Sequence, residues 1–122
     1  MSLQFSANLS FLFQEHDFLD RFGAAARAGF TGVEFHFPYA HDKAVLAEVV
    51  MTSGVEVVLF NLPAGNWAAG DRGIACHPER KAEFQDGVGR AIEYAEALGC
   101  TRLNCLAGGF ASAVLSAPTF RA

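Results

Sequence analysis

The chain has 122 residues, which is enough for one domain at most. Hydrophobic residues make up 52% and charged residues 18%, so the chain can bury a core and is not a disordered segment. The net charge of -4 and the scattered Lys and Arg residues argue against a nucleic-acid-binding protein, and no apolar run approaches the roughly 20 residues of a membrane span.

The amino terminus and the cysteines predict a cytoplasmic protein. The first residues, MSLQFSANLSFLF, lack a basic region and are interrupted by polar side chains, so we expect no signal peptide. The chain has an odd number of cysteines, Cys76, Cys100 and Cys105. Without an export signal, these cysteines are expected to stay reduced thiols.

One pattern repeats along the chain: a helical stretch, a glycine, and then a run of β-forming residues. Asp17, Asp42 and Pro78 suit the first turn of a helix, and a glycine after each helix suits the left-handed backbone often found there. In chain order, the pattern predicts a strand at 3–8, a helix at 17–28, a strand at 31–36, a helix at 42–53, a strand at 55–61, a helix at 78–98 and a strand at 101–106.

Strands that alternate with helices predict a parallel sheet with right-handed crossovers. Open doubly wound sheets and barrels both begin in this way. A dinucleotide-binding fold would have a Gly-rich turn after its first strand, whereas this chain has NLSFLF at residues 8–13. A (β/α)8 barrel is therefore favoured, and because a whole barrel needs roughly 250 residues, we expect the N-terminal half of a TIM barrel, with about four parallel strands and three helices.

A long loop follows the third predicted strand. Residues 62–77 separate this strand from the next helix, whereas such connections usually have about 2–6 residues and longer ones tend to be functional. The loop contains the single Trp of the chain, Trp67, the pair Asp71-Arg72, and three glycines. This composition is typical of a loop that covers a substrate.

Four segments resemble the hydroxypyruvate isomerase family, which includes 2-oxo-tetronate isomerases and belongs to the xylose-isomerase-like TIM barrels. They are FSANLSFLF at 5–13, GFTGVEFHFPY at 29–39, VLFNLPAGNWAAGDRGIAC at 58–76 and EFQDGVGRAIEYAEALGCTRLNCLAG at 83–108. The resemblance covers residues 3–108, and the loop motif is its most specific part.

The resemblance implies an aldose–ketose type isomerisation of hydroxypyruvate to tartronate semialdehyde, or of a related small 2-oxo acid or sugar acid, within carbohydrate and glyoxylate metabolism. A divalent metal, Mg²⁺ or Mn²⁺, polarises the substrate oxygens in such reactions, and carboxylates act as acid and base. The family places its metal ligands and both catalytic glutamates in the second half of the barrel. We therefore expect no catalytic residue and no metal ligand in this chain.

The distribution of carboxylates agrees with this expectation. Of thirteen, only Glu34 lies near the carboxyl end of a predicted strand, whereas Glu56 lies at the amino end of its strand and the others lie in helices or loops. A single carboxylate cannot form the oxygen cage of a Mg²⁺ or Mn²⁺ site. The spacings of Cys76-His77, Cys100 and Cys105 match no common zinc pattern.

The resemblance also indicates which residues bind the substrate. Arg72 could bind the carboxylate of a 2-oxo acid in a bidentate manner, and the alternative is an ion pair with Asp71 or a helix acid. Trp67 is expected to cover the pocket rather than to lie in the core. Arg80, at the start of the third helix, is expected to belong to a solvated face.

Polar residues at the strand ends complete the set of substrate-binding candidates. Glu34 and His36 lie two residues apart and so point to the same side of their strand. Each could contact substrate, or instead be a structural residue satisfied by its neighbours. Asn61 and Asn104 end their strands and could supply amide hydrogen bonds. Asn8 is a weaker candidate because Asn also suits a strand-ending turn.

The end of the chain departs from the family. Residues 109–122 contain no acidic residue and one basic residue, where a charged amphipathic helix would be expected. We therefore interpret residues 1–108 as a truncated barrel domain and residues 109–122 as an atypical tail, and expect the chain alone to be inactive. The alternatives are a non-catalytic half-barrel that self-associates through its open sheet edges, or another sugar isomerase or epimerase of the same superfamily.

Overall fold

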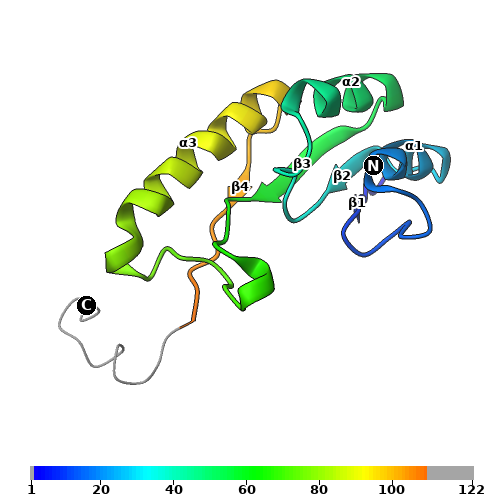
Figure 1. Ribbon diagram of the computed structural model, residues 1–122. Coiled ribbons are helices and arrows are strands. Elements are labelled where there is room, and N and C mark those ends of the chain that lie inside the picture. Colours follow the sequence, from blue (N-terminus) through cyan, green and yellow to red (C-terminus); the bar gives the residue numbers. More distant parts are fainter. Residues whose placement is uncertain (1, 110–122) are drawn as a thin grey trace.

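The computed structural model describes residues 2–109, in which four strands and three α-helices alternate along the chain (Figure 1). Two short 3₁₀ helices, η1 and η2, lie between β3 and α3. The elements are β1 (Ser6–Asn8), α1 (Phe18–Arg27), β2 (Gly32–Glu34), α2 (Lys43–Ser53), β3 (Glu56–Asn61), η1 (Trp67–Ala69), η2 (Pro78–Arg80), α3 (Lys81–Leu98) and β4 (Leu103–Asn104). Apart from Gly109, the predicted tail lies outside the described residues.

The sheet confirms the predicted half-barrel arrangement. The strands pair in the order β1-β2-β3-β4, and each neighbouring pair is parallel. The strands are shorter than predicted. Leu3 and Phe5 were included in the first strand, but β1 begins at Ser6 and both side chains are exposed. Hydrophobic character alone therefore overestimates β1, because pairing with Gly32 on β2 begins only at Ser6.

The three α-helices lie along one side of the sheet and enclose the core with it (Figure 1). Aromatic rings fill the centre of this core: Phe35 stacks on Phe60 with ring centroids 5.7 Å apart, and Phe22 of α1 packs against Phe35 at the same separation. Phe22 and Phe60 are fully buried. The helices therefore hold the sheet from one side, and the side chains at the carboxyl ends of the strands remain available for a site.

The third helix was predicted from residue 78, but Pro78–Arg80 form η2 and α3 begins at Lys81. The predicted starts of α1 and α2 agree with the structure to within one residue, but the two aspartates before them differ in what they contribute. Asp42 caps α2, because its Oδ1 accepts hydrogen bonds from the backbone N–H groups of Ala44 and Val45 at 2.8 and 3.2 Å. Asp17 occupies the same position before α1, but its side chain makes no cap hydrogen bond. The sequence suggested two equivalent caps, and only one is formed.

The long loop (residues 62–77) is attached to the segment that follows β4. Gly73 forms an isolated antiparallel bridge with Ala107, and the backbone N–H of Cys76 donates to the carbonyl of Ala107 at 2.9 Å. A Cβ on Gly73 would lie 2.0 Å from the carbonyl oxygen of Leu106. The loop thus approaches this segment at a distance that only glycine allows, and its path is set by backbone contacts rather than by loop composition alone.

No helix within residues 2–109 is long and apolar enough to cross a membrane. The same residues contain three free cysteines and no disulfide. Burial raises the pKa of the Cys100 thiol, so this cysteine is a packed, unreactive side chain rather than a nucleophile.

Replacing Asp42 and Asp17 separately by Ala should distinguish the two helix starts. Asp42→Ala should cost about 0.5–2 kcal/mol of unfolding free energy, since two backbone N–H groups lose their acceptor. Asp17→Ala should cost less, about 0.3–1 kcal/mol from the lost charge near the helix terminus. Urea denaturation followed by circular dichroism measures both, and equal losses would contradict the difference in capping.

Replacing Gly73 and Gly70 separately by Ala should separate backbone strain from steric exclusion in the long loop. Both have positive φ, 102° and 105°, but a Cβ on Gly70 meets nothing within 4 Å. Gly70→Ala should therefore cost about 1–2 kcal/mol from the backbone conformation alone. Gly73→Ala should cost clearly more and alter the fluorescence of Trp67, because the bridge to Ala107 cannot form. Urea denaturation of both variants tests this, and similar losses would argue against the close approach.

Candidate functional site

A cavity of about 300 Å³ lies at the carboxyl ends of the four strands. It is lined by Asn8, Glu34, Phe35, His36, Leu59, Asn61, Trp67, Asn104 and Leu106. Five of the six predicted substrate-binding residues are therefore brought together from β1 to β4 and the long loop, and Arg72 is the one that does not line the cavity. Asn8, which the sequence indicated as a weaker candidate, also lines the cavity.

Two side-chain pairs cross the floor of the cavity, and both join residues that are partners in the strand register. Asn8 is the register partner of Glu34, and its Nδ2 donates to Glu34 Oε1 at 3.3 Å. Asn61 is the register partner of Asn104, and its Oδ1 accepts from Asn104 Nδ2 at 2.9 Å. These pairs leave the Asn61 side-chain N–H groups and the Asn104 side-chain carbonyl oxygen without a hydrogen-bond partner among residues 2–109.

Asn8 serves two purposes at once. Its Oδ1 accepts from the backbone N–H of Ser10 at 2.9 Å, which is the strand-ending turn that the sequence suggested. Its Nδ2 binds Glu34 as described above. The turn therefore orients Asn8, and Asn8 in turn satisfies one oxygen of Glu34 without neutralising its charge.

His36 is held by its backbone and by aromatic contacts. Its backbone N–H donates to Ser10 Oγ at 2.9 Å. Its imidazole lies edge-on to Phe11, with ring centroids 4.9 Å apart, and 6.0 Å from the ring of Phe37. Glu34 and His36 both line the cavity, and so does Phe35 between them.

Trp67 lines the cavity and is 41% exposed, so it is not a core residue. Phe37 packs against its ring at 5.0 Å. On the indole lies Arg72, whose guanidinium carbon is 4.0 Å from the ring centroid. This distance corresponds to a cation–π contact, and it ties Arg72 to the residue that covers the cavity.

Arg72 does not form the ion pair that was the alternative for it. Its Nη1 donates to the backbone carbonyls of Trp67 and Asp71, at 3.0 and 2.7 Å. Within residues 2–109, these are its hydrogen bonds, so Nη2 and Nε stay available. Arg72 thus lies beside the cavity, on Trp67, with part of its donor set unused.

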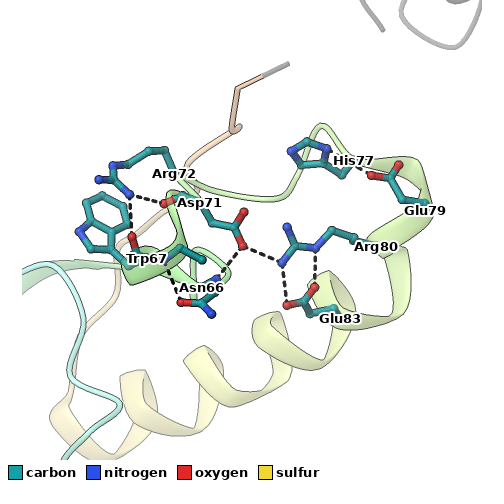
Figure 2. A network of polar contacts seen from close by, with 9 residues as sticks. Asn66, Trp67, Asp71, Arg72, His77, Glu79, Arg80 and Glu83 are labelled. Atoms are coloured by element: carbon teal, nitrogen blue, oxygen red, sulfur yellow. Dashed lines mark hydrogen bonds and ion pairs between the residues drawn. The ribbon is translucent and has the colours of Figure 1, made fainter. Parts of the chain in front are cut away.

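Asp71 instead forms an ion pair with Arg80, at 2.8 Å (Figure 2). The Nε and Nη2 atoms of Arg80 also donate to the two carboxylate oxygens of Glu83, at 2.7 and 3.0 Å. The hydrogen bond from Arg80 lowers the pKa of Asp71, with a further contribution from the backbone N–H of Asn66. The pKa of Glu83 is lowered by the same guanidinium. Arg80 was expected on a solvated face; its side chain is 27% exposed and binds both Asp71 of the long loop and Glu83 of α3.

The residues that the structure describes do not fit a divalent metal. Glu34 is the single carboxylate that lines the cavity, and residues 2–109 contain no group of three or more His, Cys, Asp or Glu side chains that could hold an ion. A Mg²⁺ or Mn²⁺ ion needs several oxygen ligands. The chemistry that these residues support is binding: amide groups, one carboxylate and one imidazole face a small cavity beneath an aromatic cover.

Comparisons with known proteins identify relatives of this chain. The chain is 58% identical to a hydroxypyruvate isomerase of Escherichia coli (strain K12) over 114 residues, which cover 90% of this chain and 44% of that protein. It is 50% identical to a 2-oxo-tetronate isomerase of Cupriavidus necator, covering 86% of this chain and 40% of that protein. The chain thus spans less than half the length of these two relatives.

A solved structure agrees with the sequence relatives. A crystal structure titled as an AP endonuclease, family 2, from Brucella melitensis superposes with a TM-score of 0.84 at 50% identity, over 86% of this chain and 41% of the other. The family described as the xylose isomerase-like TIM barrel matches residues 22–119. The chain therefore belongs to the xylose isomerase-like TIM barrel family.

Proposed function

We propose that this chain supplies the substrate-binding wall of an intramolecular isomerase that acts on hydroxypyruvate or a related small 2-oxo acid. The observation that carries the proposal is the cavity of about 300 Å³ at the carboxyl ends of the strands, where Asn61 and Asn104 present amide groups beneath Trp67. In barrels of this kind, active sites occupy this end of the strands. The 58% identity to a protein named hydroxypyruvate isomerase supports the choice of reaction.

Each polar residue has a role that matches a small 2-oxo acid. Arg72 binds the carboxylate through its unused donors, because a guanidinium matches a carboxylate in geometry and charge. Asn61 donates to the carbonyl oxygen, and Asn104 accepts from the hydroxyl group. Trp67 covers the substrate and excludes water, while Glu34 and His36 line the wall beside the reacting carbons.

The catalytic acid and base, and the ligands of a divalent metal, come from outside residues 2–109 in this proposal. Glu34 is the single carboxylate in the cavity, whereas an isomerisation of this type needs groups to remove and return a proton. When bound, a divalent cation would polarise the substrate oxygens. The described residues bind and orient the substrate, and they do not hold the ion.

A chimeric protein tests the proposal. Residues 1–108 of this chain, fused to the remaining part of the Escherichia coli relative, should isomerise hydroxypyruvate, and the 122-residue chain alone should not. Product formation can be followed by proton NMR, with the complete relative as the positive control. A folded but inactive chimera, together with self-association of the chain in sedimentation, would favour the alternative of a non-catalytic half-barrel.

A second candidate reaction is the isomerisation of a 2-oxo-tetronate. It is favoured by the 50% identity to the Cupriavidus necator relative of that name. The two reactions differ in substrate length, because a tetronate has one carbon more than hydroxypyruvate. Comparing kcat/KM of the chimera for the two acids decides between them.

The setting of the reaction is also part of the proposal. A cytoplasmic isomerase of carbohydrate or glyoxylate metabolism would meet small 2-oxo acids in solution and would keep its cysteines reduced. The three free cysteines are compatible with such a compartment.

Arg72→Ala in the chimera should lower kcat/KM for hydroxypyruvate by roughly tenfold to a hundredfold. This corresponds to the loss of about 1.5–3 kcal/mol for a hydrogen bond to a charged group, at 1.36 kcal/mol per factor of ten. Arg72→Lys should recover only part, because an ammonium cannot form the bidentate pair. A neutral analogue without the carboxylate serves as control and should be insensitive. An unchanged kcat/KM in Arg72→Ala would exclude Arg72 as the carboxylate ligand.

A further inference from the structure

The segment from Asn66 to Asp71 forms a closed turn whose geometry depends on one carboxylate. Asp71 Oδ2 accepts from the backbone N–H of Asn66 at 2.7 Å, and the backbone N–H of Asp71 donates back to the Asn66 carbonyl at 3.0 Å. Within this turn, Asn66 Oδ1 accepts from the N–H of Ala69 and so caps η1, which begins at Trp67. The carboxylate therefore closes the turn that carries Trp67 and lies next to Arg72.

The side chain of Arg80 connects this turn to α3. The same Asp71 Oδ2 that binds Asn66 accepts from Arg80 Nη2 at 2.8 Å. Arg80 is held in place by Glu83 on the first turn of α3, through two further hydrogen bonds (Figure 2). One guanidinium thus connects the loop carboxylate to a rigid helix, and planar bidentate geometry of this kind fixes orientation as well as distance.

The arrangement differs from an ordinary surface ion pair. The chain has such a pair elsewhere on the same helix: Lys43 of α2 binds Glu93 of α3 at 3.1 Å, with side chains 46% and 61% exposed. The side chains of Arg80 and Asp71 are each 27% exposed, and they form a network of several hydrogen bonds rather than one contact. Exposed single ion pairs contribute little to stability, whereas well-ordered networks of charged groups can hold a segment in place.

The backbone of Gly65 lies close to the Asp71 carboxylate. Gly65 has φ of 84°, and a Cβ there would lie 2.3 Å from Asp71 Oδ2. The backbone at Gly65 thus passes directly against the carboxylate, so the loop is packed around Asp71 before any substrate is present. Trp67 and Arg72 extend from this short turn and stack on each other.

We propose that the network of Asp71, Arg80 and Glu83 positions the turn so that Trp67 covers the cavity and Arg72 faces the substrate carboxylate. The residues of this network line no part of the cavity, so they are positioning residues and not catalytic ones. The part of the inference that concerns Arg72 and the substrate rests on the function proposed above. The part that concerns the placement of Trp67 does not.

The single tryptophan makes the first part directly measurable in the 122-residue chain. Arg80→Met removes the guanidinium and keeps the apolar stem, and it should increase acrylamide quenching of Trp67 fluorescence. Arg80→Lys should lie between Arg80→Met and the unchanged chain. Glu93→Gln, which breaks the ion pair with Lys43 on the same helix, is the matched control and should leave quenching unchanged. Equal quenching in Arg80→Met and Glu93→Gln would overturn the proposal.

Circular dichroism separates a displaced loop from an unfolded protein. The helix signal of Arg80→Met should match that of Glu93→Gln, because the network joins a loop to the start of α3 and lies outside the core. If Arg80→Met were to lose its helix signal, Asp71→Asn, which keeps an acceptor for Asn66 but removes the charge, decides the question by the same quenching measurement. Unchanged quenching in a folded Asp71→Asn would then reject the proposal.

Titration with hydroxypyruvate tests the second part by binding rather than turnover. In the unchanged chain, hydroxypyruvate should alter Trp67 emission, and a neutral polyol of similar size should not. Arg80→Met should weaken hydroxypyruvate binding several-fold, while Glu93→Gln should not. If the unchanged chain shows no response to hydroxypyruvate but quenching still increases in Arg80→Met, the proposed function fails and the positioning of Trp67 stands. Unaltered binding in a folded Arg80→Met would remove the role of the network in substrate recognition.

Discussion

The parallel register of the four strands is the constraint on which the site depends. Parallel strands end at the same edge of their sheet, so the residues that follow or end each strand are brought together without being near in sequence. Asn8 faces Glu34 and Asn61 faces Asn104 because they are register partners. A one-residue slip of either pairing would turn the participating side chains to the other face. The aromatic core around Phe35 and Phe60 holds the strands in this register.

The long loop that carries Trp67 is held in place by other contacts than the strands that form the floor of the cavity. The floor is made by strands, whose backbone hydrogen bonds fix their positions. The long loop instead depends on a few specific contacts: the backbone bridge between Gly73 and Ala107, and the carboxylate of Asp71 that joins Asn66 to Arg80. Such contacts are more exposed than a strand pair, so a loop held in this way can be rigid at rest and still be the least stable part of the site.

Few charged groups lie around the cavity. Glu34 contributes the one carboxylate of the lining, and an asparagine rather than a cation pairs with it. The guanidinium of Arg72 stacks on Trp67, which lines the cavity. The relatives are more than twice as long as the matched region, and the proposal assigns the remaining catalytic groups to parts beyond residues 2–109.

The sequence by itself determined the alternation of strands and helices, because hydrophobic periodicity, the aspartates before two of the helices and the glycines after each helix are local signals. It also indicated Glu34, His36, Asn61 and Asn104, since strand ends can be recognised from the chain and parallel topology brings such ends together.

The tertiary structure decided what these residues contact. Strand register pairs Asn8 with Glu34, and no local sequence pattern specifies the register in which two neighbouring strands align. The ion-pair partner of Asp71 could not be read from the sequence either. Arg72 is adjacent to Asp71 in sequence, but the guanidinium of Arg72 lies on Trp67. Arg80, at the start of α3, pairs with Asp71 instead. Sequence proximity could not reveal this, because the direction of a long side chain depends on the packing around it.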